Sequence, residues 1–451
     1  MRTKRTIALV LSFVMVLSLT SFVHLNADEA LYGEHSLVLP VCEVYLSEEF
    51  FANHDAALLL HHDIFNSLPQ RRDGSFVFPD YYGGHFIGDD GNLVVNIVST
   101  RDRSVCIYDS YVLGDVIANP SVNIQYVEFT YAELNDMMVF LLEHWLSDPY
   151  SRVSIAAPFN KLCVINNHIV VGIIDDYYSE EMKATFRRYV VDSPMIIFEA
   201  ITRQTEEIQP IELDSNMPNC DAESSLYEYI DIEPSNISLT LRPGDRIYIG
   251  NPTINLVPLP LSIGYGVQRG AQRGFVTTPH NWQDPFGQTV ANMRVYDRAG
   301  AGRNLIGFAT NPIAFHNHGG ANGIGADAVM VVFSGAHTLQ NTINGRTIFR
   351  GFNPPVVGQL VTAIGAVTGL HIDRPIASIN ATNSGLGRLV QVNNLPTRGG
   401  DSGGAVVNTA PGLPHNGVLA LGMIHGGGPT PTSTLVTRAD AVNAILGVSI
   451  P

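Results

Sequence analysis

The chain has 451 residues, enough for two or three domains. Its charge is divided unequally: residues 246–451 contain 12 Arg, 6 Asp and neither Lys nor Glu, a net charge of +6, which leaves −22 for the preceding 245 residues. This asymmetry indicates two units of different kind, an acidic one able to dock on a basic one. The second half has no basic cluster and no aromatic stacking pattern, which argues against nucleic-acid binding.

The N-terminus predicts a secretory signal over residues 1–27. Three basic residues fall within the first five, an apolar run extends from Ile7 to Val23, and the small Ala27 is suited to cleavage by a signal peptidase. We therefore expect a secreted, extracellular protein without a membrane anchor after signal removal. A retained anchor is the alternative, because the apolar run is close to the roughly 18 residues that span a membrane.

All four cysteines fall in the first half, and none has the spacing of a metal site. In an exported chain they pair in a way that the sequence does not specify, or they serve as small buried hydrophobic residues. We expect neither a metal nor a cofactor. The four are Cys42, Cys106, Cys163 and Cys220.

The acidic segment 28–245 predicts two small α+β subdomains followed by a linker. Two strand-like runs flank an Asp-Asp-Gly-Asn turn within 81–100, and a helix is expected over 131–146. A second hairpin at 161–175, a helix at 179–190 and a strand at 195–200 repeat the pattern, and an acidic stretch then ends near residue 233. We find no nucleophile, metal or phosphate motif in this segment.

Residues 246–451 predict an all-β domain. Short runs of Val, Ile, Thr, Asn and Gly are broken by turns every eight to twelve residues, and helical periodicity returns only at 439–448. This pattern is typical of a β-sandwich or barrel closed by a C-terminal helix.

Two motifs in this domain point to chemistry. The string GGDSGG at 399–404 places Ser402 between glycines, where the amides of Gly400 and Ser402 can converge on one oxygen. Alone, the string is also compatible with a structural turn. A serine nucleophile needs a base and an orienting carboxylate, and His280 follows the strand-like segment GFVTTPH.

These two motifs resemble the chymotrypsin-like serine peptidases, especially the bacterial α-lytic protease and streptogrisin branch, from about Leu261 to the C-terminal helix. The resemblance implies a double β-barrel and a catalytic triad of His280, Asp327 and Ser402, with Gly400 and Ser402 as the oxyanion hole. Asp327 is preferred because it opens the apolar strand 326–333. The other candidate aspartates are Asp297, which is the runner-up, Asp284 and Asp373.

Some residues near the motifs depart from this family. Pro279 stands before the histidine, and the second half lacks the family's disulfide cysteines. Proline removes one backbone donor next to His280, which leaves the triad geometry open. Asp401, next to the nucleophile, is expected to be structural and to pair with a buried cation or amine.

Substrate preference is predicted from the residues near Ser402. Pro396 stands where trypsin-like enzymes have an aspartate, so Lys or Arg specificity is not expected. The loop 395–404 resembles that of glutamyl endopeptidases, which implies a substrate-binding group of Thr397, His425, Gly426 and Gly427. In the alternative register His425 points toward Asp327 and Ile424 faces the pocket, which favours apolar rather than acidic (Glu) substrates.

The sequence thus predicts a secreted, monomeric serine endopeptidase that acts on proteins or peptides. Its segment 28–245 is expected to be a pro-region that assists folding, inhibits the enzyme and is removed by cleavage within 228–251. One alternative is a protease with a permanently attached N-terminal targeting module. Another is a non-catalytic secreted binding protein that retains the protease fold.

Overall fold

The computed structural model describes residues 46–72, 76–98, 113–202, 237–250, 260–280, 293–298, 303–317, 326–351, 354–383, 386–409, 413–414 and 417–451. The described residues from Ser47 to Pro451 belong to one compact unit. The predicted signal segment and most of the acidic linker lie outside the described residues, as do three of the four cysteines; Cys163 is described and has a free thiol. Among the described residues, no helix is both long and apolar enough to cross a membrane.

The first acidic subdomain is a three-stranded sheet with two helices. β1 and β2 are antiparallel, and β2 pairs in parallel with β3. The long helix α2 was not predicted, because His54 and His61 occupy its buried face and interrupt the apolar periodicity. Its elements are α2 (Glu48–Ser67), β1 (Tyr82–Ile87), β2 (Leu93–Val98), α3 (Gly114–Ile117) and β3 (Val122–Val127).

The second subdomain contains the predicted helices and hairpin. Thr130 and Glu133 form a capping box at the start of its first helix. The hairpin strands β4 and β5 are antiparallel, and β5 pairs in parallel with β6. The elements are α4 (Tyr131–Ser147), α5 (Arg152–Ala156), β4 (Phe159–Cys163), β5 (His168–Ile174), η2 (Asp175–Tyr177), α6 (Glu180–Tyr189) and β6 (Ile196–Ile201).

The first half of the all-β domain is a curled seven-stranded sheet, in the order β10-β11-β14-β13-β12-β8-β9. Its two edge strands, β9 and β10, are consecutive in the chain, so the sheet curls toward closure. Its strands are β8 (Arg246–Gly250), β9 (Pro260–Ser262), β10 (Gly266–Arg269), β11 (Gln272–Thr277), β12 (Arg294–Tyr296), β13 (Leu305–Asn317) and β14 (Ala326–Phe333).

The second half is a closed barrel of six strands. The pairs β18–β19, β19–β20, β20–β23, β23–β22, β22–β21 and β21–β18 complete the ring. Its strands are β18 (Leu360–Gly365), β19 (Gly369–Asn383), β20 (Leu386–Val392), β21 (Ala405–Asn408), β22 (Gly417–Gly427) and β23 (Thr434–Arg438). Short strands accompany the barrels: β7 (Thr240–Leu241), β15 (Thr338–Leu339), β16 (Thr342–Ile343) and β17 (Arg346–Phe349).

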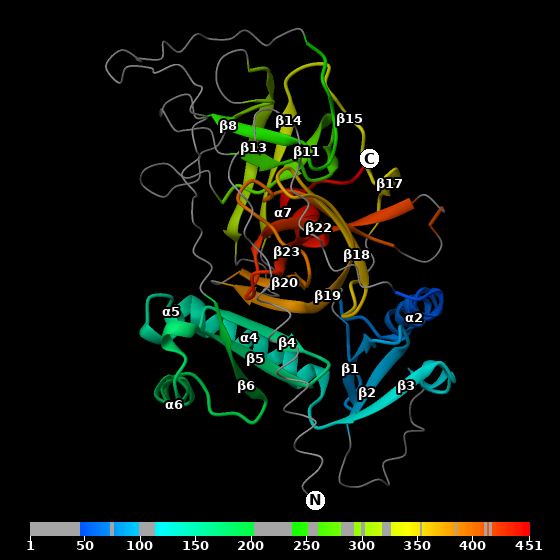
Figure 1. Ribbon diagram of the computed structural model, residues 1–451, viewed down its shortest axis with the longest axis vertical. Coiled ribbons are helices and arrows are strands. Elements are labelled where there is room, and N and C mark those ends of the chain that lie inside the picture. The colour runs from blue at the N-terminus through cyan, green and yellow to red at the C-terminus, as the bar shows by residue number, and fades with distance from the viewer. Residues whose placement is uncertain are drawn as a thin grey trace, which may run out of the picture. The chain divides into compact units, whose positions relative to one another are not determined.

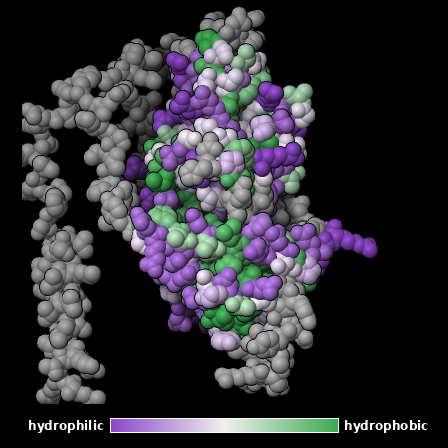
Figure 2. All heavy atoms as spheres, turned by 90° about the vertical axis from the view of Figure 1, so that its right-hand side faces the viewer, coloured by the Kyte–Doolittle hydropathy of each residue, from purple (hydrophilic) through white to green (hydrophobic). Residues whose placement is uncertain are grey.

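The predicted fold class, a double β-barrel with a C-terminal helix behind an α+β region, is confirmed. The final helix α7 (Ala439–Leu446) buries Val442 and Leu446 in one core with Met330 of β14 and Ala420 of β22. It therefore packs against both barrels (Figure 1). On the face shown in Figure 2, hydrophilic and hydrophobic residues are interspersed over the described surface.

The α+β region contacts the barrels through a shared sheet. β4 pairs antiparallel with β19, with Lys161 opposite Ala381, so that the strands β19, β4, β5 and β6 are neighbours in one sheet (Figure 1). In addition, Ser378 donates a hydrogen bond to the carbonyl of Leu162 at 3.1 Å. A strand of the second barrel thus pairs with a strand of the acidic half of the chain.

Candidate active site

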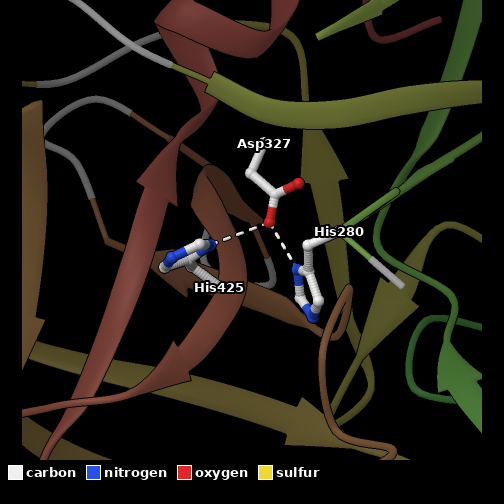
Figure 3. A group of neighbouring side chains, drawn as sticks. All are labelled: His280, Asp327 and His425. Carbon is white, nitrogen blue, oxygen red and sulfur yellow. Dashed lines mark hydrogen bonds and ion pairs between the residues drawn. The ribbon is translucent and has the colours of Figure 1, made fainter. Parts of the chain in front are cut away.

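Two neighbouring strands of the first barrel bring an imidazole and a carboxylate together. β11 and β14 are antiparallel, with Thr277 opposite Val329. The residues just beyond this pair, His280 and Asp327, therefore lie close to each other. His280 Nδ1 is 2.5 Å from Asp327 Oδ2 (Figure 3).

Asp327 accepts a hydrogen bond from a second imidazole as well. His425 Nδ1 is 2.8 Å from the same Oδ2, so the carboxylate lies between the two rings (Figure 3). A carboxylate oxygen only accepts, so each neutral imidazole carries its proton on Nδ1, and Nε2 of His280 is an acceptor. Burial of Asp327 raises the pKa of its carboxyl, but the two imidazoles outweigh burial and hold this pKa well below its usual range.

Ser402 lies in the glycine-rich loop between β20 and β21. Gly400 and Gly403 have φ values of 101° and 90°, which favour glycine. The amide of Asp401 donates to the carbonyl of Arg398 at 3.0 Å, whereas the amides of Gly400 and Ser402 donate no hydrogen bond to any described residue. These are the two amides expected to bind an oxyanion.

Asp401 anchors this loop from a fully buried position. Its carboxylate accepts hydrogen bonds from the amides of Val367, Thr368 and Arg398 at 2.8 to 3.0 Å, and from the Thr368 hydroxyl at 2.9 Å. Backbone amides thus take the place of the cation or amine that we expected beside Asp401. That expectation was wrong because turns of the chain itself supply enough donors.

Ser262, at the end of β9, supports the loop from the first barrel. Its hydroxyl donates to the carbonyl of Gly400 at 2.8 Å and accepts from the amide of Ala366 at 2.8 Å. Its own amide donates to the carbonyl of Ser402 at 2.9 Å. Ser262 was not predicted, since a single serine in an apolar strand belongs to no motif.

The Ser402 side chain contacts the backbone of His425. Its hydroxyl donates to the His425 carbonyl at 3.4 Å, and within the described part of the chain this is its one hydrogen bond. A direct bond to His280 is thus not formed in this conformation. Catalytic hydrogen bonds often tighten only once substrate is bound, and the serine hydroxyl has other staggered rotamers.

A β-bulge determines the direction of His425. The register of β22 against β23 shifts between Ile424 and Gly426, which makes His425 the extra residue. Its side chain contacts Asp327, as expected for the second of the two predicted registers. Ile424, however, is 1% exposed in the core of the second barrel, so it does not face a pocket as that register predicted.

The predicted substrate-binding residues lie on β22 and in the loop that contains Ser402. The hydroxyl of Thr397 is 3.0 Å from that of Thr434, which donates to the carbonyl of Leu395 at 2.5 Å. A Cβ added at Gly426 would meet no atom within 4 Å, which indicates open space beside this strand. The role of these residues and of Gly427 in binding substrate stays a prediction.

Of the described candidate aspartates, only Asp327 contacts His280. Asp297 instead caps a turn, where it accepts from the amide and the side chain of Asn304 at 2.7 Å each and pairs with Arg298 at 3.1 Å. Asp373 lies within β19, where the pairing with β18 is irregular, and has a φ of 53°. Asp284 is outside the described residues.

The same three side chains are the described residues that could hold a metal ion. The ligand atoms of His280, Asp327 and His425 lie within 4.8 Å of one another, and Zn²⁺ binds such donors. Both Nδ1 atoms, however, lie at hydrogen-bond distance from one carboxylate oxygen. The geometry therefore favours a hydrogen-bonded network of protonated Nδ1 atoms.

Comparison with known proteins identifies the acidic half. A Pro-like N-terminal domain matches residues 46–109, and a Pro-like C-terminal domain matches residues 132–201. The first range contains α2, β1 and β2 of the first subdomain, and the second range extends from within α4 to the end of β6 in the second subdomain. No curated protein matches the chain by sequence.

Several solved structures similar to this chain are proteases by name. A glutamic acid specific serine protease is 20% identical, with a TM-score of 0.33, covering 47% of this chain and 100% of that chain. Thermobifida fusca protease A is 20% identical with a TM-score of 0.31, covering 47% and 98%. An α-lytic protease homologue, N4, is 16% identical with a TM-score of 0.32, covering 47% and 100%. The chain thus joins segments similar to Pro-like N- and C-terminal domains to the two β-barrels.

Proposed function

We propose that this protein is a secreted serine endopeptidase made as a proenzyme. The observation that carries the proposal is the hydrogen bond of 2.5 Å between His280 and a fully buried Asp327, both in the first barrel. The second barrel supplies Ser402 in a loop where two amides make no hydrogen bond to described residues. This combination provides a base, its orienting carboxylate, a nucleophile and oxyanion donors.

The proposed mechanism is acyl transfer. Ser402 attacks the peptide carbonyl while Nε2 of His280 takes the hydroxyl proton, which it then gives to the leaving amine. Asp327 fixes the tautomer of His280 and stabilises its protonated form. The amides of Gly400 and Ser402 stabilise the oxyanion, and the loss of one such donor typically costs about 3 to 4 kcal/mol. Water then hydrolyses the acyl-enzyme by the same steps.

The acidic half is proposed to act as a pro-region, which its similarity to Pro-like domains supports. The 245 residues before the barrels have a net charge of −22, opposite to the +6 of the barrels, and β4 occupies an edge of β19. Both features support a segment that docks on the protease during folding and inhibits it until removal. Thr240 and Leu241 pair with β15 of the first barrel, so we place the cleavage site before residue 240.

The substrate preference is proposed to be acidic or apolar rather than basic. The contact of His425 with Asp327 weakens the argument for an acidic pocket. The Thr434 hydroxyl already donates to the carbonyl of Leu395, so Thr397 is the nearby hydroxyl that would donate to a small or an acidic side chain. Rates for peptides with Glu, Leu or Ala before the scissile bond decide between these. A strong preference for Leu would exclude the acidic pocket.

Labelling of secreted protein with a serine-directed phosphonylating probe tests the function. We expect the probe to label Ser402 and the N-terminus of the labelled band to lie between residues 228 and 240. The Ser402→Ala variant should remain a folded, unprocessed precursor without label. Hydrolysis by that variant would refute the proposed nucleophile. Wild-type protein that is neither labelled nor active would favour the non-catalytic binding protein, and one stable full-length active species would favour a permanently attached module.

A further inference from the structure

His425 contacts both halves of the proposed site. Its Nδ1 donates to Asp327 Oδ2 at 2.8 Å, and its backbone carbonyl accepts from the Ser402 hydroxyl at 3.4 Å. Asp327 belongs to β14 of the first barrel, whereas His425 and Ser402 belong to the second. One residue therefore links the carboxylate that orients the base to the nucleophile on the other barrel.

The carboxylate of Asp327 depends on few donors. Oδ2 accepts from both imidazoles, while Oδ1 is buried without a hydrogen-bond partner among the described residues. Pro279, just before His280, has no N–H to donate. Because a buried carboxylate needs donors to remain ionised, each of the two imidazole contacts carries a large share of this stabilisation.

We infer that His425 is a positioning residue of the proposed protease, which holds Asp327 against His280. The inference rests on the proposed function and gives His425 a role outside the substrate pocket. The β-bulge at His425 supports it, since such bulges redirect a side chain next to active sites.

The shared carboxylate also predicts an effect on pH dependence. Asp327, His280 and His425 are the titratable groups that face one another in the described part of the site. The hydrogen bond from His425 offsets part of the charge on Asp327. Its removal strengthens the attraction of Asp327 for protonated His280, so His280 holds its proton up to a higher pH.

The test compares full-length wild type, His425→Ala and His425→Asn. We expect His425→Ala to lower kcat roughly 10- to 100-fold with little change in KM, and to move the acid limb of the kcat/KM profile to higher pH. Asparagine carries an N–H at the same distance along the side chain as Nδ1, so His425→Asn should recover most of kcat. A merely structural role would not move the acid limb.

Other outcomes would overturn the inference. An unchanged acid limb of the pH profile in His425→Ala would contradict a positioning role. A raised KM for Glu substrates at constant kcat would also contradict it, because that result would indicate that His425 binds substrate. If wild type shows no Ser402-dependent hydrolysis, the proposed function itself fails. Proton NMR of the inactive Ser402→Ala protein tests the shared carboxylate independently of hydrolysis. We expect two low-field imidazole N–H signals in this protein and one signal after His425→Asn is added. A single signal in both proteins would contradict the shared carboxylate.

Discussion

Asp327 is ionised although its side chain is fully buried. Its pKa is held well below the ordinary value by the two imidazoles, against the effect of burial. A depressed carboxyl pKa means that its contribution to stability is complete above the ordinary value near 3.8 and is lost as the pH falls further. A loss of activity above pH 5 would therefore not report protonation of Asp327.

Replacing this carboxylate should remove most of the catalysis. In Asp327→Asn the amide no longer stabilises protonated His280 and no longer fixes its tautomer, so we expect kcat to fall on the order of 10⁴-fold at neutral pH. Steady-state kinetics measure the loss. The matched control is Asp297→Asn, which alters a turn cap outside this network and should keep wild-type kcat. Comparable losses in both variants would contradict the assignment of Asp327.

At this scale the sequence predicts the residues that belong to motifs and misses those that support them. His280 and Asp327 were predicted from the resemblance of their segments to a protease family, and the antiparallel pairing of β11 with β14 brings the two together. Ser262 and Thr434 lie in apolar strands, and only the fold brings them to Gly400 and Thr397. The direction of His425 depends on a bulge, which breaks the alternation of side chains on which a sequence argument depends.

The glycine-rich loop that contains Ser402 has tight backbone constraints. Gly403 has a φ of 90°, and a Cβ there would lie 2.2 Å from Thr277 Oγ1 and 2.5 Å from the carbonyl of Ser262. Gly399, four residues earlier in the same loop, has no atom within 4 Å of an added Cβ. The glycines of the motif thus differ in what they permit.

We expect Gly403→Ala to destabilise the protein by about 2 to 4 kcal/mol, through backbone strain and the clash with the first barrel. Gly399→Ala, the control, should change stability by less than about 1 kcal/mol. Urea unfolding of both variants in the Ser402→Ala background measures the difference without self-cleavage. Equal stabilities would show that the close contact of Gly403 with the first barrel does not constrain the loop.

For the molecule as a whole, the first subdomain holds the segment between the two barrels through histidines. His61 Nε2 lies 2.8 Å from the carbonyl of Pro354, and the amide of Leu360 donates to His54 Nε2 at 3.1 Å. The amide of Ile87 donates to the carbonyl of Val357 at 2.8 Å. We call these contacts between the first subdomain and residues 354–360 the seam. The sequence could not predict the seam, because residues more than 250 positions apart that contact each other leave no local pattern.

The hydrogen bonds along the seam allow only neutral imidazoles. A carbonyl only accepts, so His61 Nε2 carries the proton and its Nδ1 accepts from His85 Nε2, 2.6 Å away. His85 Nδ1 in turn accepts from the hydroxyl of Tyr82. A further proton on His61 would set two N–H groups against each other. The other titratable groups near these histidines are His62, Tyr131, and Asp55 and Asp373 beside His54.

The pKa shifts give the sign of the pH dependence. Burial lowers the pKa of His61 from 6.5 to about 4 and that of His85 well below its ordinary value. The docked state therefore binds fewer protons than the separated state, so the seam is fully stable above pH 6.5 and weakens as the pH falls toward 4. Each such histidine contributes about a tenfold loss per pH unit within this window.

Hydrogen exchange in the Ser402→Ala precursor measures this effect. Protection of the Ile87 and Leu360 amides, which donate across the seam, should fall at least about tenfold per pH unit below pH 6.5, while the Val331 amide in the first barrel serves as the reference. In His61→Gln, an amide that donates and accepts without titrating replaces the imidazole, so the slope should decrease. His62→Gln, an exposed neighbour, should leave it unchanged. Equal slopes in His61→Gln and its parent would show that acid does not act through this histidine.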